Sequence, residues 1–453
     1  MSSHSSTHRA TLTVVNRPVD TLKTNERNPR RHSKRQIKTL AQSIAAFGFN
    51  VPILIDGARQ VIAGHARLLA CRELGWPEVP TICLEHLSEP QARAFMIADN
   101  RLSDLSTWDD QLLGETLRDL SLLDLTFSLE LTGFDMGEID LRIEGLELVD
   151  NAASPDPADA KIEPALGPPV SQHGDLWHLD RHRVFCGSAL DSTCFDAVMD
   201  GQKASAVFID PPYNVKINGH VSGLGQIQHR EFAMASGEMT PVEFTTFLQT
   251  AFQRLAENSH DGALHYVCMD WRHMAETMQA AAPVYAELKN LCVWAKDNAG
   301  MGSLYRSQHE LVFVYKKGRA PHRNNVELGR HGRNRTNVWH YPGVNSFGRK
   351  GEEGNLLALH PTVKPVKLVA DAILDCSARG DIVIDSFLGS GTTLLAAERV
   401  GRCCYGLELD PHYVDTAIRR WQALTGNVAR HGESGDAFDE RAVSISRRIG
   451  GEP

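Results

Sequence analysis

The sequence predicts an α/β protein with a doubly wound, mostly parallel sheet, preceded by a smaller α/β domain. From about residue 174 onward, apolar runs of strand length alternate with stretches of helical spacing, as in sheets covered by helices on both faces. A shorter alternation of the same kind occupies residues 15–105, and a stretch rich in proline and alanine separates the two. The length of 453 residues also exceeds that of one ordinary domain.

The smaller domain is expected over residues 15–105. Apolar residues at helical spacing indicate a helix at 36–44, and Gly48 is expected to end it. The other expected elements are strands at 51–55 and 79–84 and helices at 64–74 and 89–100. These elements together give a compact α/β unit.

Three further regions follow from composition. Residues 106–150 are expected to form an acidic helical extension, because leucines recur there on one helical stripe. Residues 151–173 are assigned to an interdomain linker and residues 431–453 to a polar, loosely ordered tail. The second domain is expected over 174–430, with strands at Ala204–Ile209, Ala263–Met269, Leu288–Ala295, Leu311–Tyr315, Ile382–Ile384 and Cys404–Leu407.

The composition is that of a globular protein, with 42% apolar and 23% charged residues. No run approaches the roughly 18 apolar residues of a membrane span, and residues 1–10 lack the apolar core of a secretory signal. The nine cysteines are scattered without metal-ligand spacing, so we expect no metal site and a reducing cytoplasm. Cys403 and Cys404 are interpreted as core residues of a strand.

Charge is distributed unevenly along a chain whose net charge is −9. Two basic clusters lie on either side of an acidic region in the sequence. Such clusters can neutralise phosphates locally even in a protein with a negative net charge. The alternative interpretation is that both are solvated surface. The clusters comprise Lys23, Arg27, Arg30, Arg31, Lys34, Arg35 and Lys38, and then Lys316, Lys317, Arg319, Arg323, Arg330, Arg333, Arg335, Arg349 and Lys350.

Asp210-Pro211-Pro212-Tyr213 directly follows the apolar run 204–209. An exocyclic base amine is a poor nucleophile, and a carboxylate and a rigid carbonyl that accept its two hydrogens would activate it. Asp210 offers the carboxylate, and the carbonyl between the prolines is held because proline fixes φ. Tyr213 offers a ring on which an extruded base can stack. The alternative is a turn that only ends a strand, but α/β sheets bind ligands at this position.

A second motif, Gly389-Ser390-Gly391, lies between the apolar run 382–384 and a helical stretch. It is not a phosphate-binding loop, because no lysine follows the glycines as the GxxxxGK[ST] pattern requires. Glu408 follows about 20 residues later, a spacing at which an acid can bind a ribose diol. The motif therefore favours a carboxylate-bearing nucleoside, a description that S-adenosylmethionine fits.

With these motifs, residues 174–425 resemble the permuted β class of amino-DNA methyltransferases (N6-adenine/N4-cytosine), in which the catalytic motif precedes the cofactor motif. The resemblance implies an S-adenosylmethionine-dependent fold, catalysis by the 210–213 motif and target recognition within 298–350. One departure is Gly187-Ser188, where many relatives carry Gly-Asp; Asp191 could replace that acid. The implied cofactor-binding residues are Thr362, Lys364, Asp385, Phe387, Gly389, Gly391, Thr392 and Glu408, and the expected DNA-binding residues are Arg323, Arg330, Arg333 and Arg335.

Residues 15–105 resemble the ParB/sulfiredoxin-like N-terminal domain of partition proteins. The resemblance is carried by Asn28-Pro29-Arg30, Ser43-Ile44, Gly64-His65-Ala66-Arg67 and Asp99-Asn100. His65 stands where those proteins usually have an acid, and Ser103 where they have the last arginine of a second motif. The resemblance therefore implies the fold, with a role in DNA tethering or dimerisation as an alternative to nucleotide chemistry.

These observations favour a site-specific methyltransferase that acts on N6 of adenine in double-stranded DNA. Asn214 after the catalytic motif favours adenine, and N4 of cytosine is the nearest alternative. A partition or regulatory protein with a vestigial methylase, and an RNA methyltransferase, are the other hypotheses. We expect a cytoplasmic, nucleoid-associated protein without a membrane partner. The sequence leaves open a homodimer, a restriction-modification partner and the recognition site.

Overall fold

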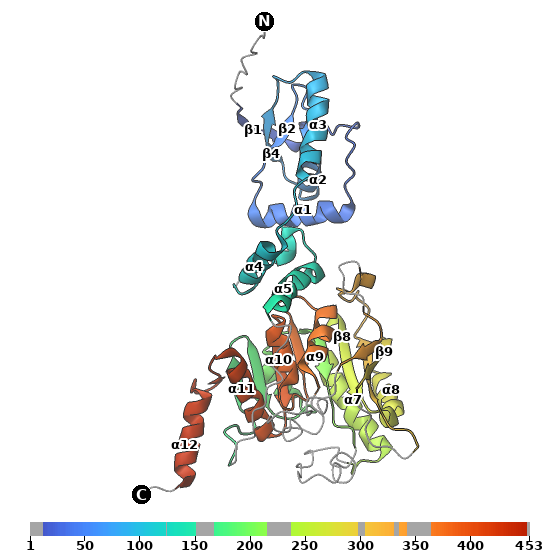
Figure 1. The fold of residues 1–453 in the computed structure, drawn as a ribbon, viewed down its shortest axis with the longest axis vertical. Coiled ribbons are helices and arrows are strands. Elements are labelled where there is room, and N and C mark those ends of the chain that lie inside the picture. Colours follow the sequence, from blue (N-terminus) through green and yellow to red (C-terminus); the bar gives the residue numbers. More distant parts are fainter. Residues whose placement is uncertain are drawn as a thin grey trace. The chain divides into compact units, whose positions relative to one another are not determined.

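The computed structural model describes residues 12–123, 125–150, 167–214, 237–297, 304–329, 335–341 and 364–450, with side chains up to 146 and 445 in the helices that end the second and last ranges. The chain divides into two compact units, Met1–Glu147 and Leu148–Pro453 (Figure 1). Each unit is an α/β structure with its own sheet.

The sheet of the first unit has four strands in the order β1-β4-β2-β3. β2 runs parallel to β4, and the other two pairs are antiparallel. Its strands and helices are β1 (Val14–Pro18), β2 (Ile53–Ile55), β3 (Val61–Ala63), β4 (Glu78–Cys83), α1 (Lys34–Phe47), α2 (His65–Glu73) and α3 (Glu89–Ser103), with a short 3-10 turn at Val19–Thr21.

Helix α1 illustrates how local sequence defines these elements. Ser33 caps its first turn by accepting a hydrogen bond from the backbone N–H of Gln36, and Gly48 ends it with φ of 85°. Ala41 and Ile44 are the buried residues of α1, in a core shared with β2, β3 and α2. The expected helix at 36–44 is therefore the centre of a longer element.

The acidic region after α3 forms two helices, α4 (Asp110–Ser121) and α5 (Met136–Asp150), joined through a 3-10 turn at Leu129–Thr132. The two helices approach closely at Gly114, where a Cβ atom would lie 2.9 Å from the carbonyl oxygen of Arg142. The region also contacts α1, through the edge-to-face rings of Phe47 and Phe127 and an ion pair between Arg35 and Asp135. It is thus an integral part of the first unit.

The second unit is built on a ten-stranded sheet in the order β11-β9-β10-β8-β7-β12-β13-β6-β5-β14. The central strands β8, β7, β12, β13 and β6 run parallel to one another. β10 runs antiparallel to β8 and β9, and β5 and β14 close the opposite edge. The strands are β5 (Leu176–Leu179), β6 (His182–Cys186), β7 (Ala204–Ile209), β8 (Ser259–Met269), β9 (Glu287–Ala295), β10 (His309–Lys316), β11 (Val338–His340), β12 (Ile382–Asp385), β13 (Cys403–Glu408) and β14 (Arg430–His431).

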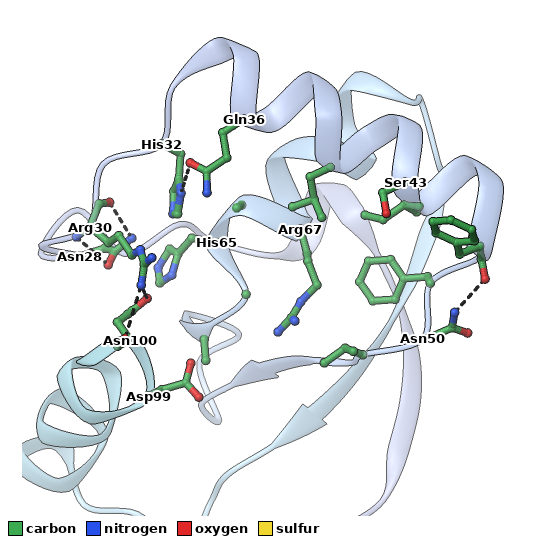
Figure 2. A pocket seen from close by; sticks show the side chains of 18 of the residues that line it. Asn28, Arg30, His32, Gln36, Ser43, Asn50, His65, Arg67, Asp99 and Asn100 are labelled. Atoms are coloured by element: carbon green, nitrogen blue, oxygen red, sulfur yellow. Dashed lines mark hydrogen bonds between the residues drawn. The ribbon is translucent and has the colours of Figure 1, made fainter. Parts of the chain in front are cut away.

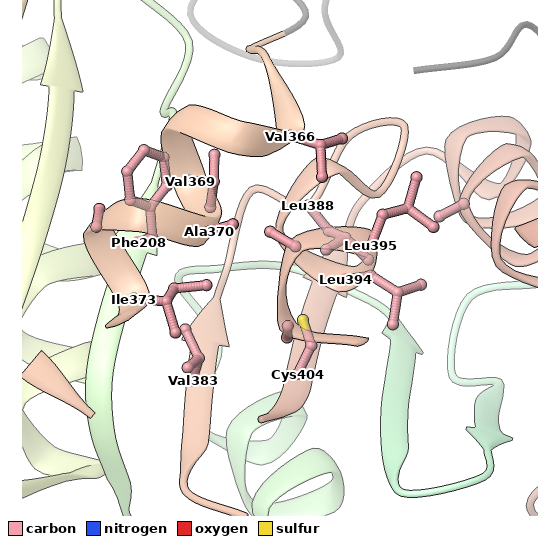
Figure 3. Packing of buried hydrophobic residues seen from close by; sticks show 14 of the residues in the cluster. Phe208, Val366, Val369, Ala370, Ile373, Val383, Leu388, Leu394, Leu395 and Cys404 are labelled. Carbon is pink, nitrogen blue, oxygen red and sulfur yellow. The ribbon is translucent and has the colours of Figure 1, made fainter. Parts of the chain in front are cut away.

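Helices cover both faces of this sheet. Two buried clusters fill the layers, one formed with α9, α10 and α11 and the other with α6, α7 and α8. Figure 3 shows the first layer, where Phe208 of β7, Val383 of β12 and Cys404 of β13 meet side chains of α9 and α10. The doubly wound sheet predicted from sequence is confirmed. The helices are α6 (Ser192–Met199), α7 (Pro241–Glu257), α8 (Met274–Ala281), α9 (Val366–Cys376), α10 (Thr392–Arg399) and α11 (Pro411–Thr425), with 3-10 turns at Trp271–His273 and Glu327–Gly329.

The C-terminal region differs from the loosely ordered tail expected over residues 431–453. β14 adds to the large sheet, and α12 (Phe438–Gly450) follows it. The Phe438 ring is fully buried with its centroid 5.2 Å from that of Trp177 in β5. Burial of one such aromatic ring stabilises a fold by about 2–3 kcal/mol. The residues around Phe438 in the sequence are mostly polar, so the sequence did not indicate that this ring is buried.

Cys404 is fully buried in β13, as expected for a core residue. Within the described ranges, no helix combines the length and the apolar character needed to span a membrane.

Candidate active site at the carboxyl edge of the large sheet

The carboxyl ends of the parallel strands bring the predicted motifs to one edge of the sheet. Asp210 follows β7, Asp385 ends β12 and Glu408 ends β13, and these three strands are neighbours. β10 runs in the opposite direction, so its first residues reach the same edge. This reversal places Glu310 there, although no motif marks it.

Lys364 is the centre of a buried charge cluster at this edge. Its Nζ lies 2.6 Å from Oδ2 of Asp210 and 2.9 Å from Oε2 of Glu310. The Lys364 side chain is only 3% exposed, whereas that of Asp210 is 18% exposed. The resemblance implied a position for Lys364 beside the cofactor; the structure pairs it with the acid of the catalytic motif.

The Tyr213 hydroxyl links the same two carboxylates. It lies 2.7 Å from Oδ1 of Asp210 and 3.1 Å from Oε2 of Glu310, and 3.2 Å from Lys364 Nζ. Lys296, which follows β9, forms a second ion pair with Glu310. Asp210, Tyr213, Glu310, Lys296 and Lys364 therefore form one connected network.

The turn after the catalytic motif is fixed by Asn214, which has a left-handed φ of 51°. Its side-chain amide donates to the carbonyl of Met239 at 2.8 Å and its oxygen accepts from the backbone N–H groups of Gly237 and Met239. Asparagine tolerates this conformation better than most residues. Asn214 thus ties the end of the motif to the segment before α7.

Burial and the neighbouring charges shift the pKa values of the two acids of the cluster in opposite directions. Burial raises the pKa of Asp210, while Lys364 opposes that rise. Burial also acts to raise the pKa of Glu310, but Lys364 and Lys296 outweigh it and lower the pKa to about 2. Burial disfavours the charge of Lys364, but the two carboxylates dominate and raise its pKa. Glu310 and Lys364 are therefore both charged at neutral pH.

The second motif forms a loop directly beside this cluster in the sheet. Asp385 accepts hydrogen bonds from the backbone N–H of Phe387 at 3.0 Å and from the Thr393 hydroxyl at 2.6 Å. Gly391 has φ of 88°, and a Cβ atom there would lie 2.8 Å from that of Ala417 in α11. Glycine is required both for the conformation and for the close approach. Thr392 then begins α10.

Glu408 closes the loop from the next strand. Its two carboxylate oxygens accept hydrogen bonds from the backbone N–H groups of Gly389 at 2.7 Å and Asp410 at 2.9 Å. Burial raises the pKa values of both Glu408 and Asp385 to about 7. Two acids at one loop repel a phosphate, whereas the neutral hydroxyls of a ribose can donate to them.

One polar atom at the loop has no partner among the described residues. The Oγ of Ser386 is buried and finds no hydrogen-bond partner among the described residues, which leaves a polar atom for a ligand. Asp191, the proposed replacement for a missing acid, instead caps α6 by accepting from the backbone N–H of Thr193. Thr362 lies outside the described residues.

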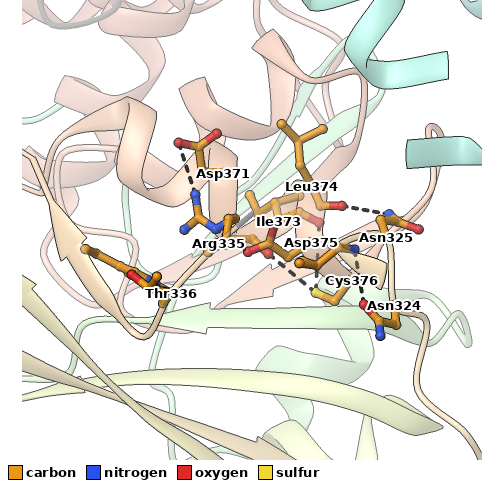
Figure 4. Close-up of polar contacts among 12 residues, drawn as sticks. Asn324, Asn325, Arg335, Thr336, Asp371, Ile373, Leu374, Asp375 and Cys376 are labelled. Atoms are coloured by element: carbon orange, nitrogen blue, oxygen red, sulfur yellow. Dashed lines mark hydrogen bonds and ion pairs between the residues drawn. The ribbon is translucent and has the colours of Figure 1, made fainter. Parts of the chain in front are cut away.

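The basic segment after β10 is fastened to α9 (Figure 4). The side-chain amide of Asn325 donates to the carbonyls of Leu374 and Ser377, both at 2.7 Å, at the end of that helix. Arg335 lies 2.7 Å from Asp375 and 3.3 Å from Asp371. These contacts position the segment that the resemblance assigned to target recognition.

The expected DNA-binding arginines therefore have different surroundings. Arg335 forms ion pairs with carboxylates of the same domain, and its guanidinium lies 5.0 Å from the ring centroid of Trp339. The structure therefore does not favour Arg335 as a phosphate contact. The sequence could not distinguish this role because a buried and an exposed arginine look alike in a basic run. Arg323 is exposed. Arg330 and Arg333 lie outside the described residues.

In the first unit, the residues that carried the resemblance line one pocket of about 460 Å³ (Figure 2). Arg30 donates to the side-chain oxygen of Asn100 at 3.1 Å and pairs with Asp104 at 3.3 Å. His65 is buried, and that burial lowers its pKa, with His32 adding to the effect. The four short motifs are thus brought together although up to 70 residues separate them.

Three family models match successive parts of the chain. A DNA methylase model matches residues 204–419, a ParB N-terminal domain model matches residues 2–101, and a ParB-methyltransferase HTH domain model matches residues 111–173. The third match spans both the helical extension and the segment that we assigned to a linker. The chain therefore contains a DNA methylase domain of the N6/N4 type, preceded by a ParB N-terminal domain and a ParB-methyltransferase HTH domain. The cofactor of this methylase family is S-adenosylmethionine, as the sequence predicted, and the matched domains imply a DNA substrate.

Curated relatives each match only part of the chain. The type II methyltransferase M2.MboI of Moraxella bovis is 23% identical over 253 residues, which are 53% of this chain and 88% of the relative. The ParB-like nuclease domain-containing protein YnaK of Escherichia coli is 40% identical over 80 residues, 18% of this chain and 92% of the relative. The match to the type II methyltransferase M.ScaI of Streptomyces caespitosus, at 37% identity, covers 20% of this chain and only 30% of that relative.

Solved structures of similar proteins include the complex of M1.HpyAVI with SAM, at 19% identity and a TM-score of 0.37, covering 52% of this chain and 98% of that one. The cytosine-N4-specific PvuII DNA methyltransferase is 15% identical with a TM-score of 0.41, covering 63% of this chain and 96% of that one.

Sequence reasoning missed two members of the cluster, Glu310 and Lys296. A charged residue at the end of a predicted strand is usually solvated. Their approach to Asp210 depends on the reversed direction of β10 between β8 and β9, which the apolar pattern of these strands does not encode.

Proposed function

We propose that this protein transfers a methyl group from S-adenosylmethionine to N6 of adenine in double-stranded DNA. The observation that supports this best is the buried cluster around Asp210, Tyr213 and Lys364, one strand away from a loop suited to a charged nucleoside. Charged groups are costly to bury. A cluster of four of them at the ligand-binding edge of a sheet points to chemistry rather than to packing.

In the proposed reaction, Asp210 accepts one hydrogen of the base amine and the carbonyl of Pro211 accepts the other. Tyr213 supplies a ring face for the extruded base, and its hydroxyl orients the Asp210 carboxylate from 2.7 Å. Withdrawal of both hydrogens towards acceptors concentrates the nitrogen lone pair. The bound cofactor supplies an electrophilic methyl group, and the role of the protein is to align the two.

The cofactor site consists, in this proposal, of Phe387, Gly389, Gly391 and Thr392, with Glu408 as the acceptor for the ribose hydroxyls and Asp385 as the support of the loop. Thr362 is proposed to contribute near the methionine end. The hydrogen bond from the Gly389 N–H to Glu408 supports the assignment, because it joins the loop to the acid. Two acids at the loop also support a ligand with ribose hydroxyls over one with a phosphate, because carboxylates accept hydrogen bonds from hydroxyls and repel phosphate oxygens.

DNA contacts are proposed for Arg323, Arg330 and Arg333 in the recognition segment 298–350. The contacts of Asn325 and Arg335 with α9 support this, since they fasten the segment on both sides of residues 330–333. The basic cluster that includes Lys23, Arg27 and Arg31 is exposed in the first unit, and we propose that this unit tethers DNA.

Nucleoside analysis tests the proposal directly. The purified protein is incubated with unmethylated genomic DNA and isotopically labelled S-adenosylmethionine, and the digested nucleosides are separated by mass spectrometry. The expected product is N6-methyladenine, and N4-methylcytosine would establish the nearest alternative. Label that moves to RNA in preference to duplex DNA contradicts the substrate. Stoichiometric cofactor binding without labelled nucleosides would support a regulatory protein with a vestigial methylase.

A further inference from the structure

The proposed reaction uses neither Glu310 nor Lys296, yet both are joined to the Asp210 carboxylate through shared partners. Glu310 is at the start of β10 and is 9% exposed. Its Oε2 lies 2.9 Å from Lys364 Nζ and 3.1 Å from the Tyr213 hydroxyl. Lys296 pairs with its other oxygen, Oε1.

The two carboxylates compete for the same two donors. The Lys364 ammonium faces Asp210 at 2.6 Å and Glu310 at 2.9 Å. The Tyr213 hydroxyl has one proton and lies within hydrogen-bond distance of both acids. When Lys364 or Tyr213 donates a hydrogen bond to Glu310, the carboxylate of Asp210 therefore keeps an oxygen lone pair that can accept a hydrogen from another donor. Lys296 is the outermost member of the cluster. Its Nζ lies 4.6 Å from the ring centroid of Trp294.

Charge balance explains why Lys296 is needed. Asp210 and Glu310 carry two negative charges and Lys364 and Lys296 two positive charges, so the cluster is neutral when every group is ionised. Without Lys296, two carboxylates would share one ammonium, and one of them would favour its protonated form. A protonated Asp210 would donate a hydrogen where the reaction needs an acceptor.

We propose that Glu310 is a positioning residue that shares Lys364 and Tyr213 with Asp210 and so leaves Asp210 available as an acceptor for the base amine, while Lys296 offsets the charge of Glu310 so that Asp210 stays ionised. The role assigned to Asp210 rests on the proposed function; the coupling among the four charges does not.

Every neighbouring element contributes a group that faces Asp210. Lys364 comes from the turn before α9, Glu310 from β10, Cys268 from β8 and Asp385 from β12, with Tyr213 from its own segment. Burial raises the pKa values of Cys268 and Tyr213, so both stay neutral, and Lys364 stays charged. Asp385, with a pKa of about 7, is the one neighbour among these that titrates near neutrality.

The test uses two opposite charge changes in the full-length protein without ligands. Infrared titration follows the protonated carboxyl band of Asp210, which is identified by its loss in Asp210→Asn. Glu310→Gln removes a negative neighbour, so the midpoint should move to lower pH. Lys296→Met removes a positive charge, so the midpoint should move to higher pH. The double variant should return towards the wild type, and Lys296→Arg should leave the midpoint in place.

The same variants are then assayed for methyl transfer and cofactor binding. We expect Glu310→Gln to lower kcat by roughly tenfold to a hundredfold, as misplacement of an acceptor does, with KM and the cofactor Kd within about threefold of the wild type. Midpoints that stay fixed, or that move in the same direction in both single variants, overturn the inference. If the wild type transfers no methyl group while the midpoints separate as expected, the proposed function fails and the charge coupling stands.

Discussion

The catalytic edge of the second unit and the pocket of the first unit both assemble polar residues from distant parts of the chain, but they treat charge differently. At the catalytic edge, Lys364 is 3% exposed and is paired with two carboxylates. In the pocket, Arg30 is paired at the surface, where its side chain is 40% exposed. Arg67 has a buried Nε without a hydrogen-bond partner among the described residues.

The difference follows from how each site is built. Parallel strands end at one edge, so β7, β12 and β13 each deliver an acid into a space already closed by helices on both faces. The pocket lies between α1, the turn before α2 and the end of α3, which leaves it open to solvent. Among the described residues, the charged groups of the first site are paired with one another, whereas Nε of Arg67 in the second has no hydrogen-bond partner and could donate to a ligand.

Substitution of Asp210 should have the largest effect on this comparison. Asp210→Ala removes the carboxylate acceptor of the base amine, and we expect methyl transfer to fall by at least about a hundredfold. Cofactor affinity, measured by calorimetry, should stay within a few-fold, because Glu408 and the loop are unchanged. Arg67→Gln in the pocket is the matched control and should leave the rate on short DNA intact. Transfer above a tenth of normal in Asp210→Ala would show that the assigned role is wrong.

Substitutions of Arg335 and Arg333 should distinguish an arginine that stabilises the fold from one that binds DNA. Arg335→Gln breaks a largely buried pair with Asp375 and should lower the free energy of unfolding by about 3 kcal/mol. Chemical denaturation of the second unit measures this loss. Arg333→Gln should leave stability unchanged but reduce the log–log salt dependence of DNA affinity by roughly one phosphate contact. The assignment fails if the two substitutions have equal effects on both stability and the salt slope.

Substitution of Glu408 should weaken cofactor binding without changing the base site. Glu408→Ala removes a buried acceptor, which corresponds to roughly tenfold to a hundredfold in Kd. Burial raises the pKa of Glu408 to about 7, so its ionised form, the better acceptor, becomes dominant only above that pH. Wild-type cofactor affinity should therefore rise between about pH 6 and 8, and the variant should lose that rise. Calorimetry at both ends of this range measures the effect, and a variant with the wild-type slope places the titration elsewhere.

The sequence predicted the parts of both sites that local motifs define. Asp210, Tyr213 and Gly391 are predicted as site residues because their motifs directly follow apolar strands, and Glu408 because of its spacing after the glycine loop. Glu310 could not be found, because its place depends on the direction of a strand rather than on its composition.

Two other features of the structure were not predicted from the sequence, for related reasons. Arg335 was grouped with the DNA-binding arginines, since its partners Asp371 and Asp375 are more than 30 residues away on α9. Phe438 is a single buried ring in a polar stretch, too little to indicate a helix that docks on β5. The role of such a residue depends on partners that are distant in the sequence, whereas the sequence pattern shows only its immediate neighbours.

Deletion of the first unit should have the smallest effect on the chemistry and so gives the sharpest test of the comparison. If the catalytic edge is complete within Leu148–Pro453, that fragment should methylate short duplex DNA with kcat within about threefold of the full chain. Among the described residues, the ion pairs and hydrogen bonds that join Asp210, Tyr213, Lys296, Glu310 and Lys364 are formed within the second unit, to which Glu408 and the loop also belong. On long DNA at low concentration the fragment should lag, because a linked second DNA-binding unit raises the effective concentration of substrate. A fragment that folds cooperatively and binds cofactor but transfers no methyl group would show that the first unit contributes to the reacting site itself.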